Sequence, residues 1–517
     1  MLFYSPIFLF IFLPVALIVF YAFAAKGLER ISIVWLFLAS LVFYGWWNPV
    51  YVPLILFSIF ANLGLGISLL RLSEVDSRSV RRAVFWTGVS INLGIIGYWK
   101  YYVFVGTTFN QLIGSGSIVE AIVLPLAISF FTFQQIGFLT DVYRGRIKRI
   151  DALRYPLFVL FFPQLIAGPI VKYGQVVPQF GRGLIRAEIP NNLSVGLGLF
   201  VVGLFKKLVL ADSLSFLADT VFDGAASGAS IGAAAAFIGV FAYSFQLYFD
   251  FCGYSEMALG LGRMFGIRLP TNFRTPYRAS SLSEFWRRWH ITLSEFLKEH
   301  VYIAMGGNRN GRLRQLRNLW TTFILGGVWH GAGWTYLVWG ALHGVLVCIN
   351  HMLFWGKRSA GQLRSGWIRR LQSGGAWMLT FLTVSMCWIP FRADSLETAY
   401  SLSASLLNLE AALDGMELFK VENQRIFQRG LANLRMIGQV PDAVFGALLG
   451  VPLLIISLLI VLFEPDSDRL TRWLSGDESV ESAKGNWLRY AVVGAVGFLV
   501  ALSYINPSGS PFLYFQF

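Results

Sequence analysis

Long apolar runs dominate the pattern of hydrophobic and polar positions along this chain. A helix that crosses about 30 Å of hydrocarbon needs roughly 20 mostly apolar residues. Runs that reach or approach this length lie near 6–23, 31–48, 50–70, 83–103, 120–140, 192–211, 231–262, 318–333, 335–355, 375–393, 444–463 and 488–505. The pattern predicts an all-α polytopic membrane protein with about 11 to 13 transmembrane helices.

One apolar segment, at 156–170, is too short and too interrupted to predict a full crossing. Pro163 lies inside it, and Gly168 and Pro169 close it. Proline removes a backbone donor and clashes with the preceding turn, so it breaks helices. Irregular backbone at membrane depth occurs only where protein or a water-filled cavity surrounds it. We therefore predict a broken or re-entrant helix here.

The segment 281–301 has a helical period but too many charges to span a bilayer. Ser281 and Glu284 have the spacing of a capping box. Apolar residues then recur at every third or fourth position, while arginines and glutamates occupy the opposite face. We predict one amphipathic helix, either at the membrane interface or lining a cavity. His290 falls at the edge of its apolar stripe and can therefore point into the protein.

The composition agrees with a membrane protein. Hydrophobic residues make up 56% of the chain and charged residues only 14%, with a mean hydropathy of +0.60. Soluble domains carry roughly 25% charged residues. The cysteines, Cys252, Cys348 and Cys387, all lie inside apolar runs. They are expected to be small core residues rather than disulfides or metal ligands.

The formal charge of +14 is distributed unevenly. Basic residues follow the first, third and fifth apolar runs, so the positive-inside rule places these loops in the cytoplasm and the amino terminus in the periplasm. The same reasoning places 394–443 in the periplasm. The segment 263–317 contains eleven arginines and lysines but only three glutamates. Because topology accounts for this excess, nucleic-acid binding is not predicted.

Ionisable side chains inside membrane segments are costly, and each is a functional candidate. His330 follows Gly326-Gly327-Val328-Trp329 and precedes another glycine, where close backbones leave room for a substrate passage. Burial disfavours imidazolium, so a neutral ring there can accept a proton from an attacking hydroxyl. From spacing alone, a packed histidine with only a structural role is an equally good interpretation of His330.

Other buried ionisable residues are open to more than one interpretation. Asp250 lies in an aromatic run, where a carboxylate needs a partner, so a structural ion pair with a buried arginine is favoured over a role in orienting a histidine. His343 and His351 are eight positions apart and can share a helix face, but no third ligand has the spacing for zinc, so no metal site is predicted. Serine-hydrolase, P-loop and zincin motifs are absent from the sequence.

Five motifs carry a resemblance to a known family. They are FPQLIAGP at 162–169, YFDFCGY at 248–254, EFWRRWH at 284–290, GGNR at 306–309 and GVWHG at 327–331. Together they resemble the membrane-bound O-acyltransferase family, in particular the bacterial branch that includes the membrane subunit of alginate O-acetyltransferase. The resemblance extends from 43–47 to 388–392, which is most of the chain.

The resemblance implies a fold and a set of site residues. It implies one membrane domain over 1–517, with a catalytic core at 151–355 between amino-terminal helices (1–150) and carboxy-terminal helices (356–517), around a central tunnel. His330 corresponds to the catalytic histidine and would be the general base, and His290 corresponds to a second histidine of this branch and would join it in the catalytic site, either positioning it or handling a second proton. The matched motifs also supply candidate substrate-binding residues, which are Trp329, Asn308, Arg309, Trp286, Arg287, Arg288 and Asp250.

The resemblance also implies a donor, an acceptor and a cellular location. Acetyl-CoA would be the donor, with no permanently bound cofactor, in the inner membrane of a bacterium. A periplasmic SGNH-type acetyltransferase and the polysaccharide biosynthesis machinery would be partners. The acceptor would be a cell-surface polysaccharide, alginate-like exopolysaccharide first and peptidoglycan or cellulose as alternatives. A glycan transporter and a scaffold for a synthase are the rival classes. The aromatic tail 511–517 is expected to be an interfacial anchor or a partner contact.

Overall fold

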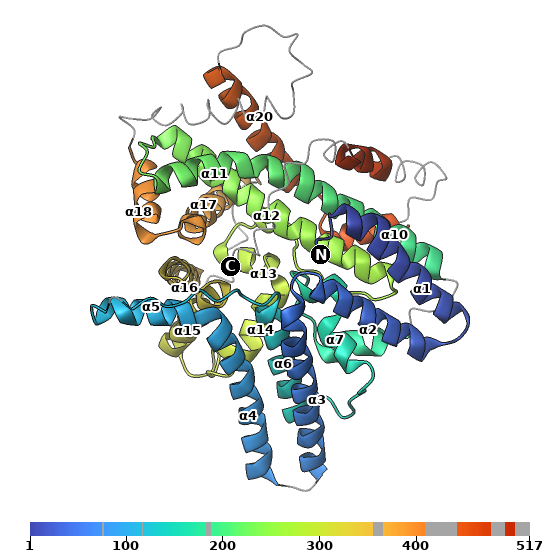
Figure 1. The fold of residues 1–517 in the computed structure, drawn as a ribbon. Coiled ribbons are helices and arrows are strands. Elements are labelled where there is room, and N and C mark those ends of the chain that lie inside the picture. The colour runs from blue at the N-terminus through green and yellow to red at the C-terminus, as the bar shows by residue number, and fades with distance from the viewer. Residues whose placement is uncertain are drawn as a thin grey trace. The chain divides into compact units, whose positions relative to one another are not determined.

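The computed structural model describes residues 1–74, 77–115, 117–181, 188–354, 366–408, 442–476 and 492–501, and in these ranges the chain forms helices and no strand (Figure 1). Most of 394–443 and the tail 511–517 lie outside the described residues. Two compact units emerge. Unit 1 comprises Met1–Phe200, Tyr254–Thr271 and Thr471–Val480, and unit 2 comprises Val201–Gly253, Asn272–Leu470 and Glu481–Phe517.

Within the described residues, six helical segments are long and apolar enough to cross a membrane. They are Phe8–Ala25, Pro49–Glu74, Ile189–Ala226, Ala233–Met264, Trp334–Leu353 and Ser373–Arg392. The pair Gly450–Phe463 and Ser467–Ser475, bent by 70°, makes a seventh candidate. Where the other expected crossings fall on described residues, they coincide with shorter, bent or more polar helices. The predicted all-α polytopic class is therefore confirmed.

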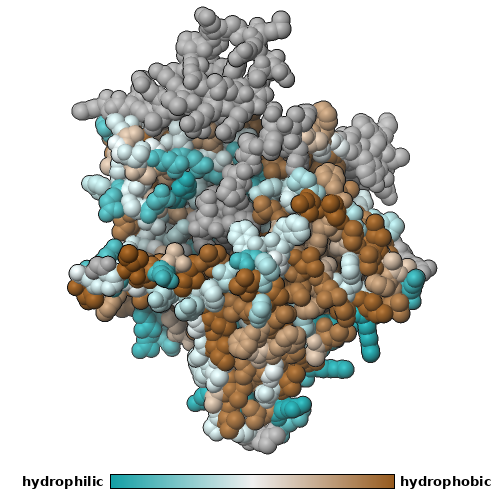
Figure 2. All heavy atoms as spheres, viewed as in Figure 1, coloured by the Kyte–Doolittle hydropathy of each residue, from teal (hydrophilic) through white to brown (hydrophobic). Residues whose placement is uncertain are grey.

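Unit 1 contains α1 to α9. Their bounds are α1 Leu13–Ala25, α2 Glu29–Gly45, α3 Val52–Glu74, α4 Arg78–Ile96, α5 Tyr102–Leu112, α6 Ile128–Tyr143, α7 Tyr155–Leu160, α8 Phe162–Leu165 and α9 Tyr173–Val176. Buried Asn62 and Asn92 exchange amide hydrogen bonds of 3.3 and 2.7 Å and so join α3 to α4. Apolar residues cover these two helices in Figure 2, as a lipid-facing surface requires.

The segment 156–170 is broken, as its prolines predict. Helix α7 ends at Leu160, the four-residue α8 follows, and no helix covers Ala167 to Ile170. Residues 157–170 are all buried in unit 1, where the Ser40 hydroxyl accepts a hydrogen bond of 3.2 Å from the amide of Phe162. Protein thus surrounds the interrupted backbone, which is the condition for tolerating it at membrane depth.

Unit 2 contains further helices, of which α13 to α16 build the candidate site. Their bounds are α11 Asp212–Ala226, α13 Leu282–Arg288, α14 Ile291–Leu297, α15 Arg312–His330, α16 Trp334–Phe354, α17 Gly366–Arg392, α18 Leu396–Ser405 and α20 Asp442–Phe463. Helices α10 (Ile189–Phe205) and α12 (Ala233–Met264) each contain a boundary between the two units, and α21 (Ser467–Ser475) contains another.

Glycines bring α15 and α16 into close contact. A Cβ on Gly340 would lie 2.6 Å from the backbone oxygen of Phe323, and one on Gly327 would lie 2.4 Å from the backbone oxygen of Tyr336. Real Cβ atoms do not approach backbone oxygens this closely, so larger residues would force the two helices apart. This contact fixes His330, the last residue of α15, against the start of α16.

The prediction of one helix over 281–301 is wrong. The structure has two short helices, α13 and α14, separated by a break at His290, whose φ is +43°. The side chain of Asn272 lies at this break, where its Oδ1 accepts hydrogen bonds from the amide and the hydroxyl of Thr292. Asn272 is 18 residues away from His290 in the sequence, so the local period of 281–301 gives no sign of the interruption.

Candidate active site

Unit 2 contains a cavity of about 340 Å³. Ligand cavities run from about 300 to 1,000 Å³, so this one has the size of a small-molecule site. Its walls come from α13, from α14 and the turn after it, from α15 and from α16. The lining residues are Ser283, Trp286, Arg287, Leu293, Ser294, Leu297, Lys298, Tyr302, Leu319, Thr322, Phe323, Gly326, His330, Trp339, Val347 and His351.

His330 belongs to the wall of this cavity and is 6% exposed. Its ring contacts the rings of Trp329, Trp339 and Phe391, with centroids 4.9, 5.0 and 5.2 Å away. These aromatic neighbours fix the orientation of the imidazole. A neutral imidazole held beside a cavity can accept the proton of a hydroxyl group that reacts there.

His290 lies outside the cavity lining that the structure describes. It is fully buried, and its Nδ1 lies 3.1 Å from Oδ1 of Asn272. Its ring packs on Phe251, with centroids 4.8 Å apart. Trp329 lies between the two histidines, with its ring centroid 6.0 Å from that of His290. Burial lowers the pKa of His290 to about 3, so this imidazole stays neutral at physiological pH.

Two lining residues, Arg287 and Lys298, are cationic and exposed, and we call them the cationic edge of the cavity. Trp339 and His330, by contrast, are buried. The cavity wall therefore combines exposed positive charge with a buried histidine. Such an arrangement suits a ligand with an anionic group at one end and an uncharged reactive group at the other.

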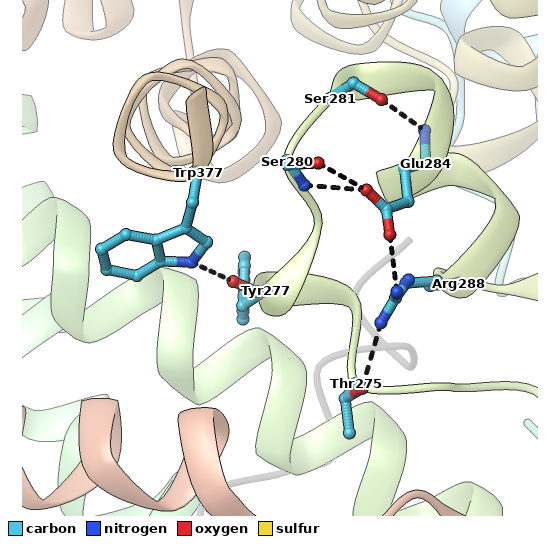
Figure 3. Close-up of polar contacts among 7 residues, drawn as sticks. All are labelled: Thr275, Tyr277, Ser280, Ser281, Glu284, Arg288 and Trp377. Carbon is cyan, nitrogen blue, oxygen red and sulfur yellow. Dashed lines mark hydrogen bonds and ion pairs between the residues drawn. The ribbon is translucent and has the colours of Figure 1, made fainter. Parts of the chain in front are cut away.

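Arg288 is not among the described lining residues and contacts Glu284 and Thr275 (Figure 3). Its guanidinium donates to a carboxylate oxygen of Glu284 at 2.5 Å and to the hydroxyl of Thr275 at 3.4 Å. Burial acts to raise the pKa of Glu284, but hydrogen bonds from Ser280 and the charge of Arg288 outweigh it and lower that pKa. The carboxylate thus stays ionised and ties the start of α13 to its end.

Asp250 is also held in an ion pair within unit 2. Its carboxylate lies 2.8 Å from Nζ of Lys207, which is equally close to Asp212, and all three side chains are buried. The structure therefore supports the structural interpretation, although the partner is a lysine and not the expected arginine. Asn308 and Arg309 occupy an exposed turn and are not among the lining residues that the structure describes.

A sequence model described as the membrane-bound O-acyltransferase family matches residues 136–386. The peptidoglycan O-acetyltransferase of Helicobacter pylori is 39% identical over 435 residues, which cover 79% of this chain and 80% of that protein. This chain belongs to the membrane-bound O-acyltransferase family. It is a multi-pass membrane enzyme that transfers acyl groups to hydroxyls, so the family predicted from the five motifs is confirmed.

Two further relatives of this O-acyltransferase are named probable alginate O-acetylase. The protein of Pseudomonas aeruginosa is 39% identical over 415 residues, covering 79% of this chain and 75% of that protein. The protein of Pseudomonas fluorescens is 34% identical over 547 aligned positions, which cover 100% of both chains. The similarity therefore extends along the whole sequence.

The sequence motifs find only part of the O-acyltransferase cavity. Trp286, Arg287 and His330 belong to them and line it, but Lys298, Trp339 and Val347 do not belong to any motif. A signal for the missing wall was present, because residues 339, 343, 347 and 351 are spaced by four and share one face of a helix. Three of these four line the cavity.

Proposed function

We propose that this chain transfers acetyl groups from cytosolic acetyl-CoA to an acceptor hydroxyl on the periplasmic side of the bacterial inner membrane. The observation that carries the proposal is the position of His330 in the wall of a cavity with a cationic edge. We choose acetyl as the transferred group because the relatives are named peptidoglycan O-acetyltransferase and probable alginate O-acetylase.

The proposed reaction is an acyl transfer with general-base catalysis by His330. The imidazole takes the proton of the acceptor hydroxyl while that oxygen forms a bond to the thioester carbonyl carbon. The carbon–sulfur bond then breaks, and the departing thiolate takes the proton from the imidazolium. We assign His290 a positioning role, exerted on His330 through Trp329, because the imidazole of His290 is neutral and lies outside the cavity lining.

The cationic edge supports the choice of donor. Acetyl-CoA carries several phosphates, and Arg287 and Lys298 are exposed where a donor would enter the cavity. Charges of this kind attract an anionic substrate and hold its phosphates. The apolar inner wall, which includes Trp286 and Trp339, suits the uncharged thioester arm.

The proposed final acceptor is a cell-surface polysaccharide. An alginate-like exopolysaccharide is our first choice, because a relative that matches this chain over its full length is named for alginate. Peptidoglycan is the second candidate, because the Helicobacter pylori relative is equally similar to this chain as the Pseudomonas aeruginosa protein. The immediate acceptor is a serine of a periplasmic SGNH-type transferase, which then acetylates the polymer.

Replacement of His330 tests the proposal directly. We expect purified H330A to remain folded but to release CoA from labelled acetyl-CoA at least about 100-fold more slowly than the wild type, because the general base is lost. H300A is the matched control, since His300 lies outside the cavity lining and should leave the rate unchanged. Equal rates for H330A and the wild type would remove His330 from the mechanism.

A further inference from the structure

A third histidine, His343, lies close to the cavity without lining it. It is located on α16, one turn after Trp339, and its side chain is fully buried. Trp339 and Val347, on either side of it along the same helix face, both line the cavity. His343 is therefore placed to support the cavity wall from behind.

His343 accepts a hydrogen bond from a residue of that wall. The indole Nε1 of Trp286 donates to Nδ1 of His343 across 3.3 Å. Because Nδ1 accepts, the ring carries its proton on Nε2. This Nε2 has no hydrogen-bond partner among the residues that the structure describes. A buried unpaired N–H is unfavourable, so an apolar side chain would pack here more easily unless the acceptor nitrogen matters.

Two indoles connect His343 to His330. The ring of Trp286 contacts those of His343 and Trp339, with centroids 5.0 and 5.8 Å away. The ring of Trp339 in turn contacts the rings of His343 and His330, each at 5.0 Å. Any rotation of Trp286 would therefore disturb the wall beside the catalytic histidine.

We propose that His343 is a positioning residue for acyl transfer. Its Nδ1 fixes the indole of Trp286, and Trp286 and Trp339 together hold the acyl group in line with His330. This inference rests on the proposed function of the cavity. It assigns His343 no proton transfer, because the ring does not reach the cavity.

Four variants test the inference in the CoA-release assay. H343L removes the acceptor while keeping an apolar side chain, and H343N keeps a polar atom near the position of Nδ1. W286F removes the donor, and W286F/H343L removes both partners. We expect kcat to fall about tenfold in H343L and in W286F, with the KM for acetyl-CoA within about threefold of the wild type. H343N should recover kcat to within about threefold.

The double variant separates positioning from simple packing. If one hydrogen bond carries the effect, W286F/H343L should be no slower than either single variant. Loss of activity in H343N equal to that in H343L, full kcat in H343L, or multiplying losses in the double variant would overturn the inference. Should H343L not fold, W286F alone decides, and full activity in W286F would overturn it. A rate of CoA release in H330A equal to that of the wild type would instead contradict the proposed function.

Discussion

At the scale of single residues, the two motif histidines differ in their surroundings. His330 faces a cavity, whereas His290 is sealed between Phe251, Trp329 and Asn272. The motifs identify both residues, but their different placement depends on contacts with residues far away in the sequence. A sequence pattern reports which residues recur together and does not report which of them meets a substrate.

His290 should make the stability of the protein depend on pH. Its pKa is about 3 in the folded protein and 6.5 in an unfolded chain, so between these values only the unfolded chain takes up the proton. Stability therefore falls as the pH decreases below 6.5, by about 2 kcal/mol at pH 5. We expect the thermal midpoint of H290N in detergent to fall less than that of the wild type between pH 7 and pH 5.

The comparison isolates His290 because the other histidines are common to both proteins. Asparagine tolerates the positive φ at this position and keeps a polar atom near Asn272. Parallel decreases of the two midpoints with pH would contradict the buried, neutral state of His290.

At the scale of helices, hydrophobic periodicity predicts where a helix occurs better than it predicts whether that helix is unbroken. Apolar runs correctly indicate the long spans such as α12 and α16, and prolines correctly indicate the break after α7. The break between α13 and α14 escapes prediction because the side chain of Asn272 sets it from outside the segment. Local patterns cannot report a partner that only the fold brings near.

The close contact of α15 with α16 predicts a sensitive position at Gly340. In G340A the new methyl group would lie 2.6 Å from a backbone oxygen and 3.1 Å from Cα of Gly327, and neither backbone atom can rotate away. We expect a destabilisation of about 2 kcal/mol and a loss of acyl transfer, because His330 moves relative to Trp339. Thermal unfolding and the CoA-release assay measure these effects.

G94A is the matched control for G340A. Gly94 is also a helical glycine, on α4, and a Cβ there would meet nothing within 4 Å. Alanine should stabilise this helix slightly or leave it unchanged. Equal behaviour of the two variants would show that the contact between α15 and α16 can relax.

At the scale of the whole molecule, composition and charge give the class of protein without giving its site. The hydrophobic fraction of 56% indicates a membrane protein, and the motifs indicate its family. Neither property locates the cavity, because its lining comes from stretches spread over residues 283–351 that only the fold assembles. The proposed orientation in the membrane likewise rests on the distribution of arginine and lysine.

The basic character of the chain, with a net charge of +14, includes the cavity cations Arg287 and Lys298, which lead to a prediction about salt. If Arg287 and Lys298 attract the phosphates of acetyl-CoA, the KM for this donor should rise several-fold between 50 and 300 mM salt, since screening is strong over about 10 Å at 0.1 M. S-acetylpantetheine, which lacks phosphates, is the control and should show a constant KM. Equal salt dependence of both donors would argue against a phosphate contact.

The positive φ at His290 also limits how this position can change over evolution. Glycine, asparagine, aspartate and histidine tolerate such a backbone, whereas branched and bulky residues do not. Even if His290 were not needed for activity, few other residues could therefore replace it without backbone strain. Retention of histidine here among relatives would say less about chemistry than retention at His330, which ends an ordinary right-handed helix and is free of that restriction.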